Sequence, residues 1–93
     1  MIVSFADRDA ERLFQRQRVK RLDPRLHRKA LITLWLLDAV HELDELRVPP
    51  GNRLEALKGA RIGQHSIRIN DQRRICFVWT PEGPSEVEIV DYH

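Results

Sequence analysis

The stretch from Ser66 to Trp79 constrains the fold of this chain more than any other. Apolar and polar residues alternate on both sides of Asn70-Asp71-Gln72, a pattern typical of two antiparallel strands joined by a short turn. Because successive side chains of a strand point to opposite faces, one face of the hairpin is apolar. The residues of this predicted core face are Ile67 and Ile69 in the first strand and Ile75, Phe77 and Trp79 in the second.

The other face of the hairpin carries Ser66, Arg68 and Arg74. Arginines on a rigid sheet are held in place more firmly than arginines on a loop. The planar guanidinium also presents two parallel donors to a phosphate group. This face is therefore the first candidate for an anion-binding site.

The chain before the hairpin predicts one short strand and two helices. Ile2 to Phe5 is an apolar run that predicts an edge or second strand of the sheet. Asp7 is a suitable N-cap for a helix that ends near Arg18. Asp23-Pro24 restarts the chain as cap and first helical residue of a longer helix, which runs to about Leu43.

Two further segments contain proline and glycine. Pro49 to Asn52 cannot continue a helix and permits a turn that leads back to the sheet. Thr80 to Ser85 predicts a second turn, because a strand is implausible there. Glu86 to Tyr92 then predicts a last strand that pairs with the second strand of the hairpin.

These elements predict a single α+β domain over residues 1–93, the size of one domain. It consists of a short N-terminal strand, two helices and a three- to four-stranded antiparallel sheet with the helices packed on one face. The opposite face is left free to bind a ligand.

The net charge of +2 and the pI near 9.1 do not identify a partner, but the distribution of the basic residues is informative. Basic side chains crowd the first third of the chain, where phosphate backbones would be attracted to them, unless they only form a solvated helix face. This basic block is Arg16, Arg18, Lys20, Arg21, Arg25, Arg28 and Lys29, and Arg68 and Arg73 of the hairpin add to the candidate nucleic-acid contacts.

Several classes of protein are disfavoured. No apolar run approaches the roughly 20 residues that span a bilayer, and the N-terminus lacks the features of a secretory signal. The single cysteine, Cys76, cannot form an internal disulfide and is expected to be a small buried side chain in a cytoplasmic protein. The four histidines show no ligand-like spacing, so we expect neither a metal nor a cofactor.

Four short motifs, taken in order and spacing, carry a resemblance that covers essentially the whole chain. They are Arg53-Leu54 with Leu57-Lys58-Gly59, then Ser66 to Asn70, then Arg74-Ile75 with Phe77, and the ending Asp91-Tyr92-His93. The chain resembles the HigB-type, GraT-like toxins of the RelE superfamily. The resemblance implies a RelE-like fold and a ribosome-dependent endoribonuclease that cuts mRNA in the A site beside 16S rRNA. It also implies neutralisation by a HigA-type antitoxin, with operator DNA bound only through the antitoxin complex.

RNA cleavage without a metal needs a base, an acid and cations that stabilise the charged phosphate. Lys58 and Arg74 are the candidate cations, with Arg68 or Arg73 as further donors. His93 is the candidate for proton transfer, because imidazole titrates near neutral pH. Tyr92 could stack on a base, and Asp91 could orient His93 or share its role.

Strand alternation complicates the terminal trio. If Tyr92 faces the site, Asp91 and His93 face elsewhere unless the strand has already ended. Without the resemblance, a frayed and solvated terminus would be the simpler interpretation.

The chain departs from its relatives at Glu55, where many carry a histidine. Glu55 could act as a base, but a surface role is favoured, and the loss suggests a milder toxin. His65 is expected to pack at the sheet edge.

Three functional hypotheses follow. A ribonuclease requires Lys58, Arg74 and His93 to converge on one concave face. A nucleic-acid-binding module without catalysis would use the basic block instead. A subunit that only completes a repressor complex would expose apolar surface around Trp35 or the first strand.

Overall fold

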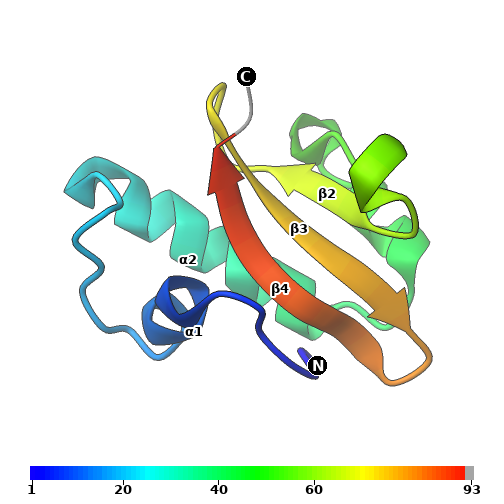
Figure 1. The fold of residues 1–93 in the computed structure, drawn as a ribbon, viewed down its shortest axis with the longest axis horizontal. Coiled ribbons are helices and arrows are strands. Elements are labelled where there is room, and N and C mark those ends of the chain that lie inside the picture. Colours follow the sequence, from blue (N-terminus) through cyan, green and yellow to red (C-terminus); the bar gives the residue numbers. More distant parts are fainter. Residues whose placement is uncertain (92–93) are drawn as a thin grey trace.

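A computed structural model describes residues 1–91; Tyr92 and His93 lie outside the described residues. The elements, in chain order, are helices α1 (Arg8–Phe14) and α2 (Pro24–Ala39), 3₁₀ turns η1 (Leu43–Arg47) and η2 (Pro50–Asn52), strand β1 (Glu55–Ala56), 3₁₀ turn η3 (Gly59–Arg61), and strands β2 (His65–Arg68), β3 (Arg73–Thr80) and β4 (Gly83–Asp91). The predicted α+β class is confirmed, with the two helices followed by the sheet (Figure 1).

The four strands form one antiparallel sheet in the order β1-β2-β3-β4. β2 and β3 are the predicted hairpin, with Ile67 opposite Ile75 and Arg68 opposite Arg74. The Asn70 side chain closes its turn by accepting the backbone N–H groups of Gln72 and Arg73 at 3.0 and 2.7 Å, as Asx turns do.

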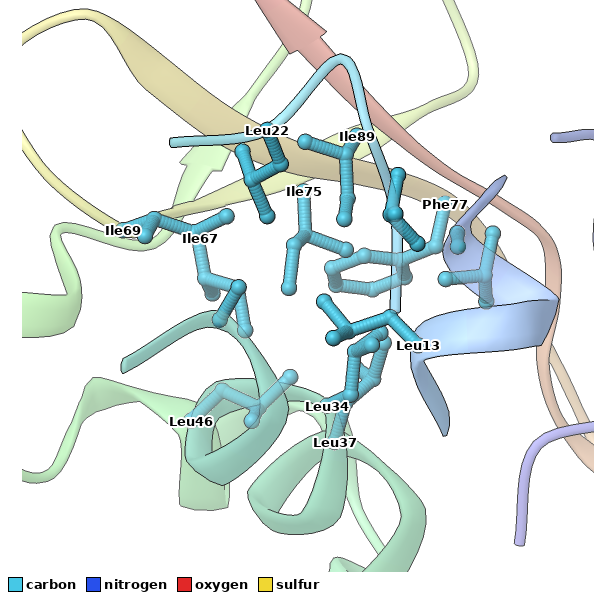
Figure 2. Packing of buried hydrophobic residues seen from close by; sticks show 14 of the residues in the cluster. Leu13, Leu22, Leu34, Leu37, Leu46, Ile67, Ile69, Ile75, Phe77 and Ile89 are labelled. Carbon is cyan, nitrogen blue, oxygen red and sulfur yellow. The ribbon is translucent and has the colours of Figure 1, made fainter. Parts of the chain in front are cut away.

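The core lies between the helices and one face of the sheet. Ile67, Ile75 and Phe77 are fully buried there, and Figure 2 shows them facing Leu34 and Leu37 of α2. The predicted apolar face of the hairpin is therefore the core face, although its last member, Trp79, is only partly buried against the cluster.

Both helices begin where their caps were predicted and end earlier than expected. The Asp7 carboxylate accepts the N–H of Asp9 at 2.9 Å, and the Asp23 carboxylate accepts that of Arg25 at 2.9 Å. α1 ends at Phe14 rather than near Arg18, because Arg16 adopts a left-handed backbone with φ 66° that cannot continue a helix. α2 ends at Ala39 because the next residue is extended.

The first residues do not form the expected strand. Ile2 to Phe5 run beside β4 through a parallel bridge between Phe5 and Val87, with backbone hydrogen bonds from Val3 N to Pro84 O and from Ala6 N to Val87 O. The left-handed backbone of Glu86, φ 52°, interrupts the regular edge of β4. This part of the prediction is therefore wrong in element type, although the segment does lie at the sheet edge.

The predicted turn over Thr80 to Ser85 is also too long. Only residues 81–82 form the turn, and β4 begins at Gly83, which pairs with Thr80. Glycine is required there because φ is 132° and an added Cβ would lie 2.2 Å from the Met1 carbonyl oxygen. Proline is tolerated at the second residue of the strand, near its start.

The Asp7 carboxylate connects three parts of the fold, so its removal should destabilise the protein. The carboxylate caps α1, accepts the N–H of Ile89 in β4 at 3.2 Å and pairs with Arg21. Asp7→Ala should lower the free energy of unfolding by about 2 kcal/mol, because two backbone N–H groups lose their acceptor. Urea denaturation measures the change.

Asp44→Ala is the matched control. Asp44 is 83% exposed, and within residues 1–91 it pairs only with Arg47, at 3.2 Å, so its loss should change the free energy of unfolding by less than about 0.5 kcal/mol. Equal effects of the two substitutions would show that Asp7 does not connect the elements.

Candidate active site on the polar face of the sheet

Arg74 occupies the centre of the sheet face opposite the helices. Its side chain is only 7% exposed, and a buried guanidinium needs hydrogen-bond acceptors. Nε donates to Ser66 Oγ at 2.8 Å, and Nη2 donates to the carbonyl oxygen of Arg53. The polar face of the hairpin is thus confirmed, and Arg74 is held in a fixed orientation on it.

The sequence predicted that this face is open, but in the structure it is bordered on one side. The edge strand β1 lies beside β2, Arg61 of η3 contacts Glu88 of β4, and the carbonyl oxygen of Arg53 accepts a hydrogen bond from Arg74. The segment between η2 and β2 therefore forms one wall of the site. A short edge strand that pairs only through Glu55 and Ala56 had no clear sequence signal.

Glu55 lies at the rim of the site. Its pairing with Ser66 puts it on the same face as Arg74, and its carboxylate oxygen is 4.0 Å from Arg74 Nη1 while the side chain is 50% exposed. The favoured interpretation of Glu55 as a plain surface residue is therefore incomplete, because its charge also acts on the guanidinium.

Lys58 follows β1 at the start of η3. Its side chain is exposed, and no ion pair to it is found within residues 1–91. β1 and β3 are separated by one strand, so their backbones are about 10 Å apart. Lys58 thus belongs to the wall of the site rather than to its centre.

Arg73 and Asp91 form an ion pair on the other face of the sheet. Their side chains meet at 2.8 Å, and the two residues are the last pair of the β3–β4 ladder. Arg73 also lines a hollow of about 550 Å³ with Asp23 and Leu26 from the start of α2. The structure therefore does not bring Asp91 to Arg74, in agreement with the alternation argument; Tyr92 and His93 lie beyond the described residues.

A second polar cluster shares the face of Arg74 and was missed in the sequence. Arg61 donates to Glu88 at 2.7 Å and to Gln64 at 3.0 Å, and the hydrogen bond to Glu88 raises the pKa of Arg61. Glu88 pairs with Cys76 in the ladder. The alternation of the last strand could have placed Glu88 on this face; the partner Arg61, in a 3₁₀ turn, had no signal.

Cys76 itself has the predicted packing role. Its side chain is fully buried, and burial raises the pKa of the thiol.

The basic block divides into paired and unpaired side chains. Arg21 pairs with Asp7 and Asp9, and Arg25 pairs with Asp23, whose pKa is lowered by that hydrogen bond. Arg68 of the hairpin likewise pairs with Asp71. Five cations are exposed and make no ion pair within the described part of the chain: Arg16, Arg18, Lys20, Arg28 and Lys29.

His27 and His65 have structural positions. His27 Nε2 lies 2.9 and 3.0 Å from the carbonyl oxygens of Val19 and Leu22, so it joins α2 to the preceding loop. His65 stacks on Phe77 with ring centroids 6.2 Å apart, which confirms its packing role, but β2 lies between β1 and β3, so the predicted position at the sheet edge is wrong. Within residues 1–91, no three potential metal ligands of the His, Cys, Asp and Glu types converge. None of the helices there is long and apolar enough to cross a bilayer.

Comparison with solved structures identifies the fold. A YoeB/ParE toxin from Agrobacterium tumefaciens superimposes with a TM-score of 0.54 over 99% of this chain and 98% of its own, at 22% identity. The fold of this chain is therefore similar to that of the Agrobacterium tumefaciens toxin over nearly the whole length of both chains.

Sequence comparison then gives the family. The profile of the HigB-like toxins, described as RelE-like toxins of the type II toxin-antitoxin system HigB, matches residues 3–93. Toxin HigB-1 of Vibrio cholerae serotype O1 is 40% identical over 80 residues, which cover 85% of this chain and 84% of that protein. The chain belongs to the HigB-like family of type II toxins, and this membership implies an antitoxin partner.

The buried thiol predicts a loss of stability at alkaline pH. Because the pKa of Cys76 is higher in the folded protein than in the unfolded chain, its contribution is fully present below the unfolded pKa of about 8.5 and is lost as the pH rises above it. The advantage of the wild type over Cys76→Ala in free energy of unfolding should therefore shrink between pH 7 and pH 10. Urea titrations of both proteins measure this difference in free energy of unfolding. A difference that stays constant with pH would contradict the raised pKa of the Cys76 thiol.

Proposed function

We propose that this toxin is a ribosome-dependent endoribonuclease that cleaves mRNA in the ribosomal A site. The observation that carries the proposal is the Arg74 guanidinium, fixed by Ser66 and Arg53 on the polar face of a HigB-family fold. A rigidly held cation that faces a phosphate stabilises the charge of the transition state without reorganising during the reaction.

The reaction is a transesterification within the RNA. The 2′-oxygen bonds to the adjacent phosphorus, and the bond from phosphorus to the 5′-oxygen breaks. A base removes the 2′-hydroxyl proton and an acid gives a proton to the leaving 5′-oxygen, so the products are a 2′,3′-cyclic phosphate and a free 5′-hydroxyl.

Arg74 and Lys58 are the proposed cations in this reaction. The hydrogen bonds of Arg74 define the plane of its guanidinium, whereas Lys58 supplies a mobile point charge from the wall of the site. His93 is the proposed proton-transfer group, and Glu55, 4.0 Å from Arg74, is the alternative base. Tyr92 is proposed to position the nucleobase of the RNA substrate.

Asp91 is proposed to be a positioning residue rather than a group that takes part in the reaction. Its ion pair with Arg73 holds the end of β4 against the start of β3. The two residues that follow it in sequence are those proposed to contact RNA, so the pair would fix the point from which they extend.

The ribosome supplies the remaining orientation. A domain of this size contacts only a short piece of RNA, and a substrate that is already positioned reacts much faster. The unpaired cations of the basic block are proposed contacts for 16S rRNA. A HigA-type antitoxin is the proposed partner that neutralises the toxin, operator DNA would be bound only through that complex, and the cytoplasm is the proposed site of action.

The nuclease assignment is tested by primer extension on mRNA from translating ribosomes. The intact protein should cut within A-site codons, and Arg74→Ala and His93→Ala should each reduce cleavage tenfold or more, about 1.4 kcal/mol of transition-state stabilisation. Arg12→Ala is the control, because Arg12 is half exposed on α1 and, among the described residues, makes a single ion pair, of 4.0 Å.

Arg74→Lys keeps the positive charge but loses the hydrogen-bond geometry of the guanidinium. The melting temperature of the variant shows whether it is still folded. Absence of cuts by the intact protein, or cutting by the Arg74 and His93 variants at the wild-type level, would leave the binding-module hypothesis as the better one.

The positioning role of Asp91 is tested by exchanging the two charges. Arg73→Glu and Asp91→Arg should each reduce cleavage, because each places two like charges at the end of the ladder. The double variant Arg73→Glu/Asp91→Arg should restore most of the activity if only the ion pair matters. If the double variant is as inactive as Asp91→Arg, the Asp91 carboxylate acts in the chemistry itself.

A further inference from the structure

An open apolar groove lies on the helical layer, away from the polar face of the sheet. It has a volume of about 410 Å³ and runs between the end of α1, the following loop and α2. Its apolar lining comes from Leu13, Leu31 and Trp35. Trp35 is 40% exposed, and Ile32, one turn away on the same helix, is 47% exposed. Large apolar side chains that cluster on a surface mark an interaction site.

The rim of the groove is positively charged. Arg16, Arg18 and Arg28 line it, and they are three of the five block residues that make no ion pair within the described residues. The other residues that line it, Gln17 and His27, carry no acidic group. The groove therefore combines an apolar floor with uncompensated positive charge.

This combination fits a protein segment better than RNA. The Arg16 guanidinium lies 5.0 Å from the centre of the Trp35 ring, so a cation already occupies one face of the indole on which a base could stack. Phosphate groups alone would leave the apolar floor exposed to water. A segment with an aliphatic or aromatic side chain flanked by carboxylates would satisfy both the floor and the rim.

We infer that this groove binds an acidic amphipathic segment of the antitoxin. The inference deepens the proposed function and rests on the antitoxin partner named there, but not on RNA cleavage. An apolar side chain of the antitoxin packs on Leu31 and Trp35, and its carboxylates pair with Arg16, Arg18 and Arg28. Binding there covers three of the five unpaired cations of the basic block, so the antitoxin would also remove charge that attracts rRNA.

The test is a calorimetric titration of the separately purified antitoxin into the full-length toxin. Trp35→Ala removes the largest apolar contact, and Arg28→Glu reverses a rim charge on an exposed side chain whose loss should not affect folding. Each should weaken binding about tenfold or more, as expected for a central anchor and for a charge placed against like charge.

Two controls match these changes outside the groove. Val48→Ala truncates an apolar side chain that is 70% exposed, and Lys20→Glu makes the same charge change as Arg28→Glu within the basic block. Both should bind the antitoxin with an affinity close to that of the wild type.

Unchanged affinity of Trp35→Ala and Arg28→Glu would overturn the inference, as would an equal loss in Lys20→Glu, which would indicate attraction by net charge alone. Cleavage on ribosomes without antitoxin separates the two proposals. If Trp35→Ala weakens cleavage and leaves antitoxin affinity intact, the groove serves the ribosome and the inference is wrong. If the toxin cleaves no RNA but the groove variants lose the antitoxin, the inference stands and the nuclease proposal fails.

Discussion

The alternation of side chains along β3 is the constraint on which both faces of this molecule depend. Ile75 and Phe77 enter the core, while Arg74 and Cys76 point to the opposite face. Since β3 pairs on both edges, its register is fixed by β2 and β4 together. A slip of one residue would bury Arg74 among the leucines of α2 and expose Phe77. The apolar core therefore specifies where the arginine of the site lies.

Burial of the Arg74 guanidinium in turn shapes the wall of the site. A nearly buried cation is costly unless its donors are satisfied, and one acceptor is the backbone carbonyl of Arg53. Arg53 adopts a left-handed backbone with φ 48°, which is unfavourable for a side chain larger than glycine. The hydrogen bond to Arg74 offsets part of that strain. The loop before β1 and the centre of the sheet thus stabilise each other, and the same contacts orient the guanidinium for an anion.

Local signals in the sequence predicted local features, and long-range contacts accounted for the rest. The starts of both helices were predictable because an aspartate cap acts within its own turn. Their ends were not, since α1 stops where Arg16 turns left-handed and no residue type there requires it. The start of β4 at Gly83 depends on the approach of Met1 from the other end of the chain, which no local pattern reveals.

In the candidate site, too, local patterns were predictable and long-range contacts were not. Alternation alone placed Arg74 and Ser66 on one face. The pairing of Arg73 with Asp91 required the register of β4, and the Arg53 carbonyl could not be predicted because a backbone acceptor has no sequence signature. The contribution of Glu55 was underestimated, since its position opposite Ser66 follows from a strand of only two residues.

The role of each basic side chain depends on whether a carboxylate lies close enough to pair with it. Arg21 pairs with Asp7 and Asp9 across the fold and so helps to hold the structure together, whereas Arg25 pairs with Asp23 two residues away, and this local pair neutralises its charge. The unpaired members of the basic block have no such partner within residues 1–91 and remain available for binding. The number of charges that can neutralise phosphate is therefore smaller than the seven basic residues of the block. Because the salt dependence of RNA binding scales with that number, the paired arginines should contribute little to it, although the sequence alone makes them look equivalent.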